Sequence, residues 1–375
     1  MKILIGADLV PTKSNEELFV NADIEKLVGF DLLDILKKHD FRIFNLETPL
    51  CDKLNPIVKC GPNLSAKTST VNGIKKLNVD LLSLANNHIL DQNEAGLKST
   101  MKVLTENSIN YVGVGDLFSA NKPYFIYDGK KRICIYSCAE NEFSIVSKNN
   151  IGANPFDVYK TYDDIKMLKN ESDYLIVLYH GGKEFYRYPS PMLQIRCRKM
   201  IENGADLVVT QHSHCIGCNE EYLNGKIVYG QGNFIFDLAD NEYWKTSILL
   251  SVDVDSNDIQ YIPIVKKAEL VRLADIDEKN KILSDFYERS RLIMNSEFVE
   301  EEYKKFAVAN ISNYICASKG KTLFGKVMNK ITKGYYFKIK AKFYGKKQAV
   351  ILYNYLKCEA HYELFITALE NKINK

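Results

Sequence analysis

The chain has 375 residues, 46% of them hydrophobic, which predicts a globular protein of one large domain or two ordinary ones. The N-terminal MKILIGADLV is too short and too polar for a secretory signal, and no later stretch reaches the roughly 18 apolar residues of a membrane span. A net charge of +3 says little about partners. We therefore expect a cytoplasmic chain without a membrane-spanning helix.

Short apolar runs recur along the chain as far as Val265, and segments with helical spacing separate several of them. This repetition of buried strands and helices predicts an α/β architecture. The later strands follow one another without helices, so part of the sheet is expected to be antiparallel. The predicted strands are 3–6, 41–46, 79–85, 109–115, 132–137, 173–179, 205–209, 226–230, 246–254 and 259–265, and the predicted helices are 24–39, 94–107, 162–171 and 191–203.

The character of the chain changes after about Lys267. Residues 268–311 are mixed in charge with helical periodicity, and residues 319–357 combine lysine with tyrosine, phenylalanine and aliphatic residues. We therefore predict an α/β domain at 1–267 and a helical, lysine-rich C-terminal extension at 268–375.

Polar residues that bind metals follow several of the predicted strands. His88, His180, and the pair His212 and His214 stand at or just after the ends of apolar runs, and Asp8 and Glu47 end earlier strands in the same way. The carboxyl ends of strands in an α/β sheet are where ligand-binding loops gather. Carboxylates, imidazoles and amide oxygens together suit a divalent ion such as Mn, Zn or Fe.

Five motifs in order carry a family resemblance: NLETP, SLANNHILD, VLYHGGKEF, VTQHSH and VYGQGNFIFD. Over about residues 1–240 the chain resembles the CapA/PgsA-type proteins of poly-γ-glutamate capsule biosynthesis, which have the calcineurin-like metallophosphatase fold. The resemblance implies a four-layer α/β/β/α sandwich, here with a helical C-terminal extension. It also implies a hydrolase-like site with one or two divalent ions per chain.

The resemblance implies a role for each matching residue. Glu47 corresponds to the bridging acid, and His88 to the residue that donates a proton or stabilises the transition state. The implied metal ligands are Asp8, Glu47, Asn87, His180, His212 and His214.

Further residues near these motifs are predicted to act on the substrate. Asp91 is expected to orient the imidazole of His88, and Glu184 to act as general base, outer-sphere ligand or substrate clamp. Lys183 belongs to the same motif as Glu184. Lys59 and Asn233 lie in loops that resemble those of the family, and we expect both to bind an anionic group.

The chain departs from the superfamily at two positions. The first motif, Asp-x-His in the superfamily, is Asp8-Leu9-Val10 here, and the glycine before His-x-His is Gln211. One ligand is therefore missing, so two ions, a single ion, or a second ion of low affinity all fit the sequence.

The nine cysteines form an odd, scattered set, which indicates reduced thiols instead of a disulfide framework. Cys215 and Cys218 lie close to the histidine pair. We interpret them as small residues beside the site, because a zinc knuckle needs a second pair of comparable spacing.

The lysine-rich segment from Lys319 to Lys357 has two interpretations. Between Glu302 and Glu359 there are thirteen lysines and no Asp or Glu. A solvated helix face is one interpretation, and a surface for an anionic membrane or a polyanion is the other. Nucleic acid is not expected, because there is no recognition motif and no arginine between Lys319 and Lys357.

Three functions remain open on this evidence. The first is a CapA-like protein of capsule or exopolymer biosynthesis with a metal-dependent hydrolase-like site, acting on an anionic polymer or a phosphorylated substrate. The second is a non-catalytic scaffold that binds the polymer or its synthase partners. The third is a stand-alone phosphoesterase, because the fold does not settle the function.

Overall fold

A computed structural model describes residues 1–237, 241–267, 270–318, 323–357, 365 and 369. The chain divides into two compact units, Met1–Val299 and Glu300–Lys375. Cys358, His361 and the first two lysines of the lysine-rich segment, Lys319 and Lys321, lie outside the described residues.

The first sheet of the N-terminal unit has eight strands with β1 near its centre. β1 pairs in parallel with β2 and β13 and antiparallel with β14, and the later strands β14, β15 and β16 pair antiparallel, as predicted. In spatial order the strands are β16 (Leu270–Leu273), β15 (Asp258–Lys267), β14 (Thr246–Asp253), β1 (Lys2–Leu9), β2 (Phe41–Leu46), β3 (Leu81–Ser83) and β4 (Asn110–Val112), with β13 (Asn233–Ile235) beside β1.

The second sheet has six strands, and its central strands β9, β10 and β12 run parallel to one another. Its spatial order is β11 (Ile216–Tyr222), β12 (Gly225–Gln231), β10 (Leu207–Gln211), β9 (Tyr174–His180), β7 (Lys131–Ala139) and β6 (Tyr124–Asp128). The short strands β5 (Val114–Gly115) and β8 (Gly152–Ala153) form a separate pair.

The period of two along the strands builds three apolar layers. Ile3 and Ile5 of β1 pack in the same core as Ile176 of β9, between the two sheets. Leu4 of β1 packs in a second core under the helices of its own sheet, and Val177 of β9 packs in a third core under the helices of the other sheet. The result is the predicted four-layer α/β/β/α sandwich.

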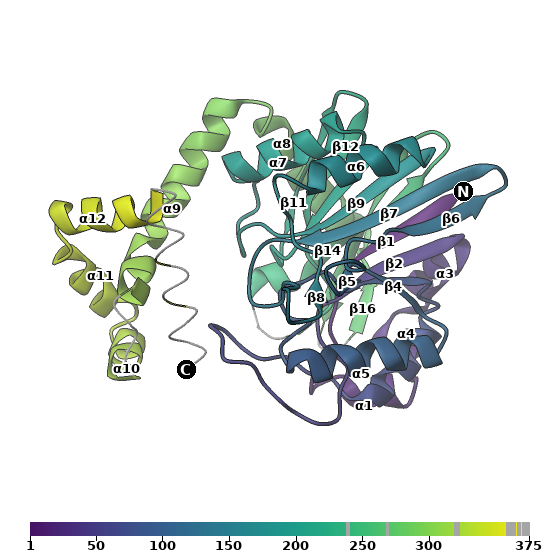
Figure 1. The fold of residues 1–375 in the computed structure, drawn as a ribbon, viewed down its shortest axis with the longest axis horizontal. Helices are drawn as coiled ribbons and strands as arrows, with labels where there is room; N and C mark the ends of the chain where they lie inside the picture. Colours follow the sequence, from purple (N-terminus) through teal and green to yellow (C-terminus); the bar gives the residue numbers. More distant parts are fainter. Residues whose placement is uncertain (238–240, 268–269, 319–322, 358–364, 366–368, 370–375) are drawn as a thin grey trace. The chain divides into compact units, whose positions relative to one another are not determined.

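The helices lie on the outer faces of the two sheets (Figure 1). The first sheet is covered by α1 (Glu16–Val20), α2 (Ile24–Leu27), α3 (Phe30–Lys38), α4 (Val71–Lys76) and α5 (Asn93–Glu106), and the second by α6 (Thr161–Asn170) and α7 (Pro191–Glu202). Two 3₁₀ helices, η1 (Thr68–Thr70) and η2 (Glu242–Trp244), lie in loops.

The division between the units falls after Val299, later than the predicted boundary at 267. β16 extends the first sheet by pairing with β15, and α8 (Ile276–Leu292) places Phe286 in the core between the sheets. β16 is only four residues long and contains an arginine, so its sequence carries little of the alternation that marks a strand.

The C-terminal unit is helical, as predicted. α9 (Ser296–Ser318) leads into it, and α10 (Leu323–Ile331), α11 (Tyr335–Lys342) and α12 (Lys346–Lys357) follow. None of the helices in the described ranges combines the length and the hydropathy that a membrane span requires.

Candidate metal centre

The six predicted ligands come from strand ends of both sheets. Asp8 lies near the end of β1, Glu47 directly follows β2, and His180 is the last residue of β9. Asn87 lies in the loop after β3, and His212 and His214 lie in the loop after β10. All six are buried, although each has a polar side chain.

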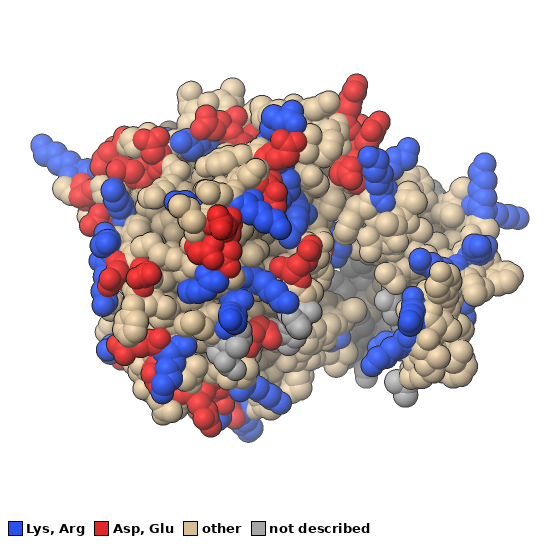
Figure 2. Space-filling model, turned by 180° about the vertical axis from the view of Figure 1, so that it is seen from behind, with Lys and Arg blue, Asp and Glu red and all other residues tan. Residues whose placement is uncertain are grey.

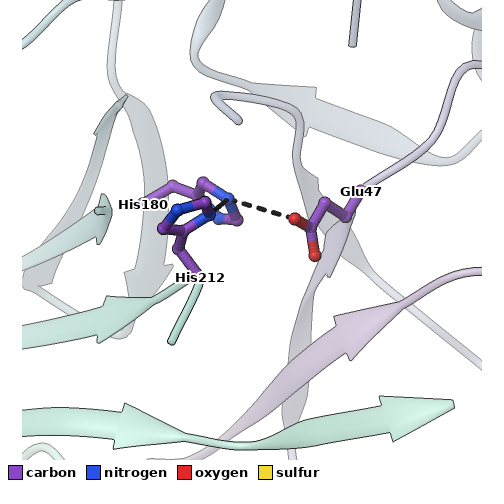
Figure 3. Close-up of side chains that lie close together, drawn as sticks. All are labelled: Glu47, His180 and His212. Atoms are coloured by element: carbon purple, nitrogen blue, oxygen red, sulfur yellow. Dashed lines mark hydrogen bonds and ion pairs between the residues drawn. The ribbon is translucent and has the colours of Figure 1, made fainter. Parts of the chain in front are cut away.

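Glu47, His180 and His212 form a first group in which one donor atom from each lies within 4.8 Å of the others. Figure 3 shows the two imidazoles and the carboxylate turned toward one another. His180 Nε2 lies 3.3 Å from Glu47 Oε1 and 3.2 Å from His212 Nδ1. The amide oxygen of Asn87 lies 3.0 Å from the same Nε2. These four donors suit one divalent ion.

Asp8, Glu47 and His214 form a second group within the same 4.8 Å limit. His214 Nδ1 lies 3.6 Å from Asp8 Oδ2 and 2.9 Å from Oδ1 of Asn233. Because Glu47 belongs to both groups, it would contribute a ligand to an ion held at either one.

The charge balance of these residues fits bound metal. Asp8 Oδ2 and both oxygens of Glu47 are buried and accept no hydrogen bond from any described residue. An ionised carboxylate is costly to bury unless it is paired or coordinates a metal. A cation between the two groups would satisfy all three oxygens.

The imidazoles differ in how burial and charge set their pKa. Burial and the neighbouring His180 and His214 hold the pKa of His212 well below its usual range. Burial also opposes charge on His180 and His214, but Glu47 and Asp8 outweigh it and raise both pKa values, that of His214 to about 9. His212 is therefore neutral and ready to bind metal, whereas the other two must first lose a proton.

The two departures from the superfamily have structural explanations. Val10 packs with Phe236 and Trp244 in a small apolar cluster, and Trp244 stacks on His214 with ring centroids 4.9 Å apart. An apolar wall therefore stands where the superfamily has a histidine. Gln211 Nε2 donates to Gly6 O at 2.9 Å, so this residue joins the two sheets beneath the site.

His88 belongs to a buried polar cluster beside the ligands. Its Nδ1 lies 2.6 Å from Asp91 Oδ2, which is the orienting contact that the sequence predicts. Lys59 forms an ion pair with Asp91, and its Nζ lies 3.1 Å from His88 Nδ1. With Nδ1–H directed at Asp91, the Nε2 of His88 is left for a substrate. Lys59 is thus engaged with Asp91, and its side chain is only 3% exposed.

The loop that carries Lys59 is fastened to the residues that follow His88. The N–H of Ile57 donates to Asp91 O at 3.1 Å, and the N–H of Leu64 donates to Asp91 Oδ2 at 2.6 Å. Asn55 N–H donates to Gln92 Oε1 at 2.8 Å.

The remaining predicted residues lie at the edge of the centre. Lys183 is one of the positive neighbours that help burial to lower the pKa of His212. Glu184 is half-buried and makes no ion pair or hydrogen bond with another described residue. Burial raises the pKa of the Cys215 thiol to about 11 and that of Cys218 well above its usual value, so both thiols stay protonated.

The structure adds Glu140, which the sequence reasoning missed. Its Oε1 lies 3.5 Å from Nε2 of His212, and its Oε2 accepts the N–H of Gly182 at 3.2 Å. Because His212 faces the first group with Nδ1, Glu140 is placed to hold the far nitrogen and fix the ring's orientation. Glu140 directly follows β7, so it carried the same signal as Glu47, an acid after an apolar strand.

Lys266 was also missed. Its Nζ donates to the backbone oxygen of Asn233 at 2.8 Å. Burial lowers the pKa of Lys266 to about 7, although Asp8 and Asp237 oppose the shift. It lies at the end of the long strand β15, directly after the run predicted at 259–265.

The site lies inside the region that matches a known family. The family model described as bacterial capsule synthesis protein PGA_cap matches residues 5–238, which is more than half of the chain. The chain belongs to this family. The resemblance carried by the five sequence motifs is therefore confirmed, and the residues of both ligand groups lie within the matched PGA_cap region.

Two relatives of the chain are proteins described as CapA. Capsule biosynthesis protein CapA of Bacillus anthracis is 32% identical over 245 residues, which cover 61% of this chain and 58% of that protein. PGA biosynthesis protein CapA of Bacillus subtilis (strain 168) is 27% identical over 208 residues, covering 54% of this chain and 55% of that protein. The matched region thus spans little more than half of each relative.

Solved structures that are similar to the chain have low sequence identity to it and TM-scores below 0.5. A phosphatase from Mycoplasma pneumoniae is 14% identical with a TM-score of 0.44, covering 71% of this chain and 93% of that one. A hypothetical protein from Thermus thermophilus is 12% identical with a TM-score of 0.41, covering 72% of this chain and 96% of the other.

Metal titration should distinguish the two ligand groups. We expect Mn²⁺ added to the metal-free chain to bind at both, with the Asp8 group weaker because Val10 supplies no donor. His212→Ala should lose the tighter ion, His214→Ala the weaker one, and Glu47→Ala both.

Trp244, the single tryptophan, stacks on His214, so its fluorescence should follow the weaker ion. His39→Ala is the matched control, since His39 contacts Ile35 and Ser251 instead. A wild-type chain that binds no Mn²⁺ would contradict the assignment.

Metal affinity should increase with pH. Both His180 and His214 have raised pKa values, that of His214 to about 9, so proton release accompanies metal binding to these imidazoles, and His214 must lose its proton near neutral pH. We expect the affinity for Mn²⁺ to rise with pH as far as about pH 9, the pKa of His214, and to level off above it. Calorimetry in buffers of different ionisation enthalpy should detect the protons released, and pH-independent binding would contradict this protonation scheme.

Glu140→Gln should weaken the first ion selectively. The amide cannot hold the His212 ring as a carboxylate does, so we expect a loss of roughly tenfold or more in affinity for that ion. Trp244 fluorescence should still report the other ion unchanged. Glu142→Gln is the matched control, because Glu142 lies two residues further on and is exposed. Equal losses in both variants would show that only the overall charge matters.

Proposed function

We propose that the chain is a metal-dependent hydrolase-like protein of capsule or exopolymer biosynthesis, of the poly-γ-glutamate type. Membership of the PGA_cap family supports the pathway. The observation that carries the chemistry is the pair of overlapping ligand groups that share the buried carboxylate of Glu47, whose oxygens accept no hydrogen bond from a described residue.

The residues of the centre divide the work of hydrolysis between them. Asp8, Glu47, Asn87, His180, His212 and His214 would hold the metal, and Asn233 Oδ1, 2.9 Å from His214 Nδ1, would offer the Asp8 group a further oxygen donor. When bound, a divalent ion supplies Lewis-acid polarisation of a phosphoryl or acyl oxygen and activates water. We propose Mn, Zn or Fe, because the donors are imidazoles and oxygens without thiolate.

His88 would protonate the leaving group. Asp91 accepts a hydrogen bond from Nδ1–H of His88 and would stabilise the imidazolium form of that ring. In this form Nε2 carries the proton that would be donated. Lys59 forms an ion pair with Asp91, so the charge of this carboxylate is balanced within the cluster. Glu184 has no partner among the described residues and is thus available as a base or substrate clamp.

The proposed substrate is an anionic polymer or a phosphorylated compound. Two metal ions and Lys183 would give the centre the positive charge that such a substrate requires. We also propose a cytoplasmic location, which is supported by the eight described cysteines, all of them free.

A non-catalytic role is the second candidate, and Val10 favours it. The loss of a ligand at this position is the change expected where a metallophosphatase fold is retained only for binding a polymer or partner proteins. A stand-alone phosphoesterase would have the same centre and would differ only in its substrate.

Activity measurements should separate these candidates. We expect the Mn²⁺-loaded chain to hydrolyse bis-p-nitrophenyl phosphate or poly-γ-glutamate, and His88→Ala to lower kcat by roughly 10² to 10⁴-fold. His88→Ala should bind Mn²⁺ as the wild type does, because His88 is not a ligand. Asp91→Asn should lower kcat as well, whereas the His39→Ala control should leave it unchanged. Activity on the phosphodiester alone would favour the phosphoesterase, and a loaded chain without activity on either would favour the scaffold.

A further inference from the structure

The helices α10 and α11 of the C-terminal unit form a hairpin with a defined internal packing. The turn between them contains Gly334 at φ 91°, where the N–H donates to Asn329 O at 2.8 Å. Asn329 Oδ1 accepts the N–H of Phe337 at 3.0 Å, and the ring of Phe337 is buried. The hairpin is thus a folded element with an inside and an outside.

The outside of the hairpin is apolar along one side of each helix. Phe324, Val327 and Ile331 of α10 are spaced by three and four residues, and Tyr335, Ile339 and Phe343 in and after α11 are spaced by four. Such spacing places each set on one face of its helix. All six are strongly exposed, from 49% for Val327 to 79% for Phe343. A soluble surface seldom leaves so many large apolar side chains together.

Lysines surround these apolar side chains. Eight exposed lysines lie between residues 326 and 347, and no Asp or Glu occurs between residues 303 and 358. Lys338 lies over the ring of Tyr335 at 5.5 Å and Lys340 over that of Tyr336 at 5.2 Å. On the side shown in Figure 2, blue and tan atoms cover α10 to α12. The eight lysines are Lys326, Lys330, Lys333, Lys338, Lys340, Lys342, Lys346 and Lys347.

We propose that the α10–α11 hairpin binds the surface of an anionic lipid membrane. The lysines would contact the lipid head groups, and the aromatic and aliphatic side chains would enter the interface. An anionic polymer would need the lysines but would give no role to six exposed apolar residues. The combination of charge and apolar surface therefore favours a membrane. This inference does not depend on the proposed hydrolase activity.

Vesicle binding by the full chain tests the proposal. We expect sedimentation with vesicles that contain phosphatidylglycerol, little with pure phosphatidylcholine, and weaker binding as salt increases. One variant removes the apolar side chains (Phe324→Ser, Ile331→Ser, Phe343→Ser), and another removes charge (Lys330→Gln, Lys338→Gln, Lys342→Gln). Each should weaken binding by roughly tenfold or more.

Matched changes in the N-terminal unit serve as controls. Phe118, Tyr159 and Leu223 are 86%, 87% and 71% exposed, so their change to serine removes comparable apolar surface. Lys53, Lys75 and Lys76 are exposed lysines for the same change to glutamine. Both controls should bind like the wild type, and circular dichroism checks that every variant is folded.

The proposal is overturned if the wild type does not bind anionic vesicles, or if the serine variant of the hairpin binds as the wild type does. Soluble poly-γ-glutamate is the comparison probe, and binding to it alone would assign the lysines to a polymer instead.

Discussion

The buried carboxylate of Glu47 is the constraint on which the site depends. It has no exposed surface and no hydrogen-bond donor among the described residues, yet it belongs to both ligand groups. A buried charge of this kind is stable only when positive charge stands close by. The two sheets provide it by meeting at the carboxyl ends of their parallel strands, so that His180 and the His212–His214 loop of one sheet face Asp8 and Glu47 of the other. The ligand groups therefore form only because the two sheets pack face to face.

Sequence reasoning predicted the strands and helices because they leave local signals, whereas the layered arrangement was implied by the family resemblance. Apolar runs mark the strands, and polar residues directly after strands, such as Asp8 and His180, mark the predicted ligands, which the structure brings close together. Sequence reasoning missed Glu140 although that residue follows a strand in the same way, because the contact with His212 depends on how β7 lies beside β9. The compact N-terminal unit extends beyond the predicted boundary for a similar reason. β16 and α8 are held by pairing and packing with distant segments, which a single sequence does not reveal.

The departures from the superfamily also needed the structure. Val10 reads as a missing ligand, but in the fold it is part of the wall formed by Phe236 and Trp244 against His214. Gln211 stands where the superfamily has a glycine, and its side-chain amide donates a hydrogen bond to a backbone carbonyl of the opposite sheet. Gln231 does the same, donating to Ile5 O and Ile248 O at 3.0 Å. Two buried glutamines thus satisfy backbone carbonyls where the sheets approach each other.

The loop of residues 55–64 is held in place by hydrogen bonds and by one buried ion pair. It is pinned to Asp91 and Gln92 by backbone bonds and by the Lys59 ion pair, while Val58 beside Lys59 is 80% exposed. The carboxylate that orients His88 therefore also holds the loop of residues 55–64 in place. Loss of the charge on Asp91 would remove the ion pair with Lys59 and weaken the contact with His88 at the same time. The position of the loop and the orientation of the imidazole are therefore coupled through one side chain.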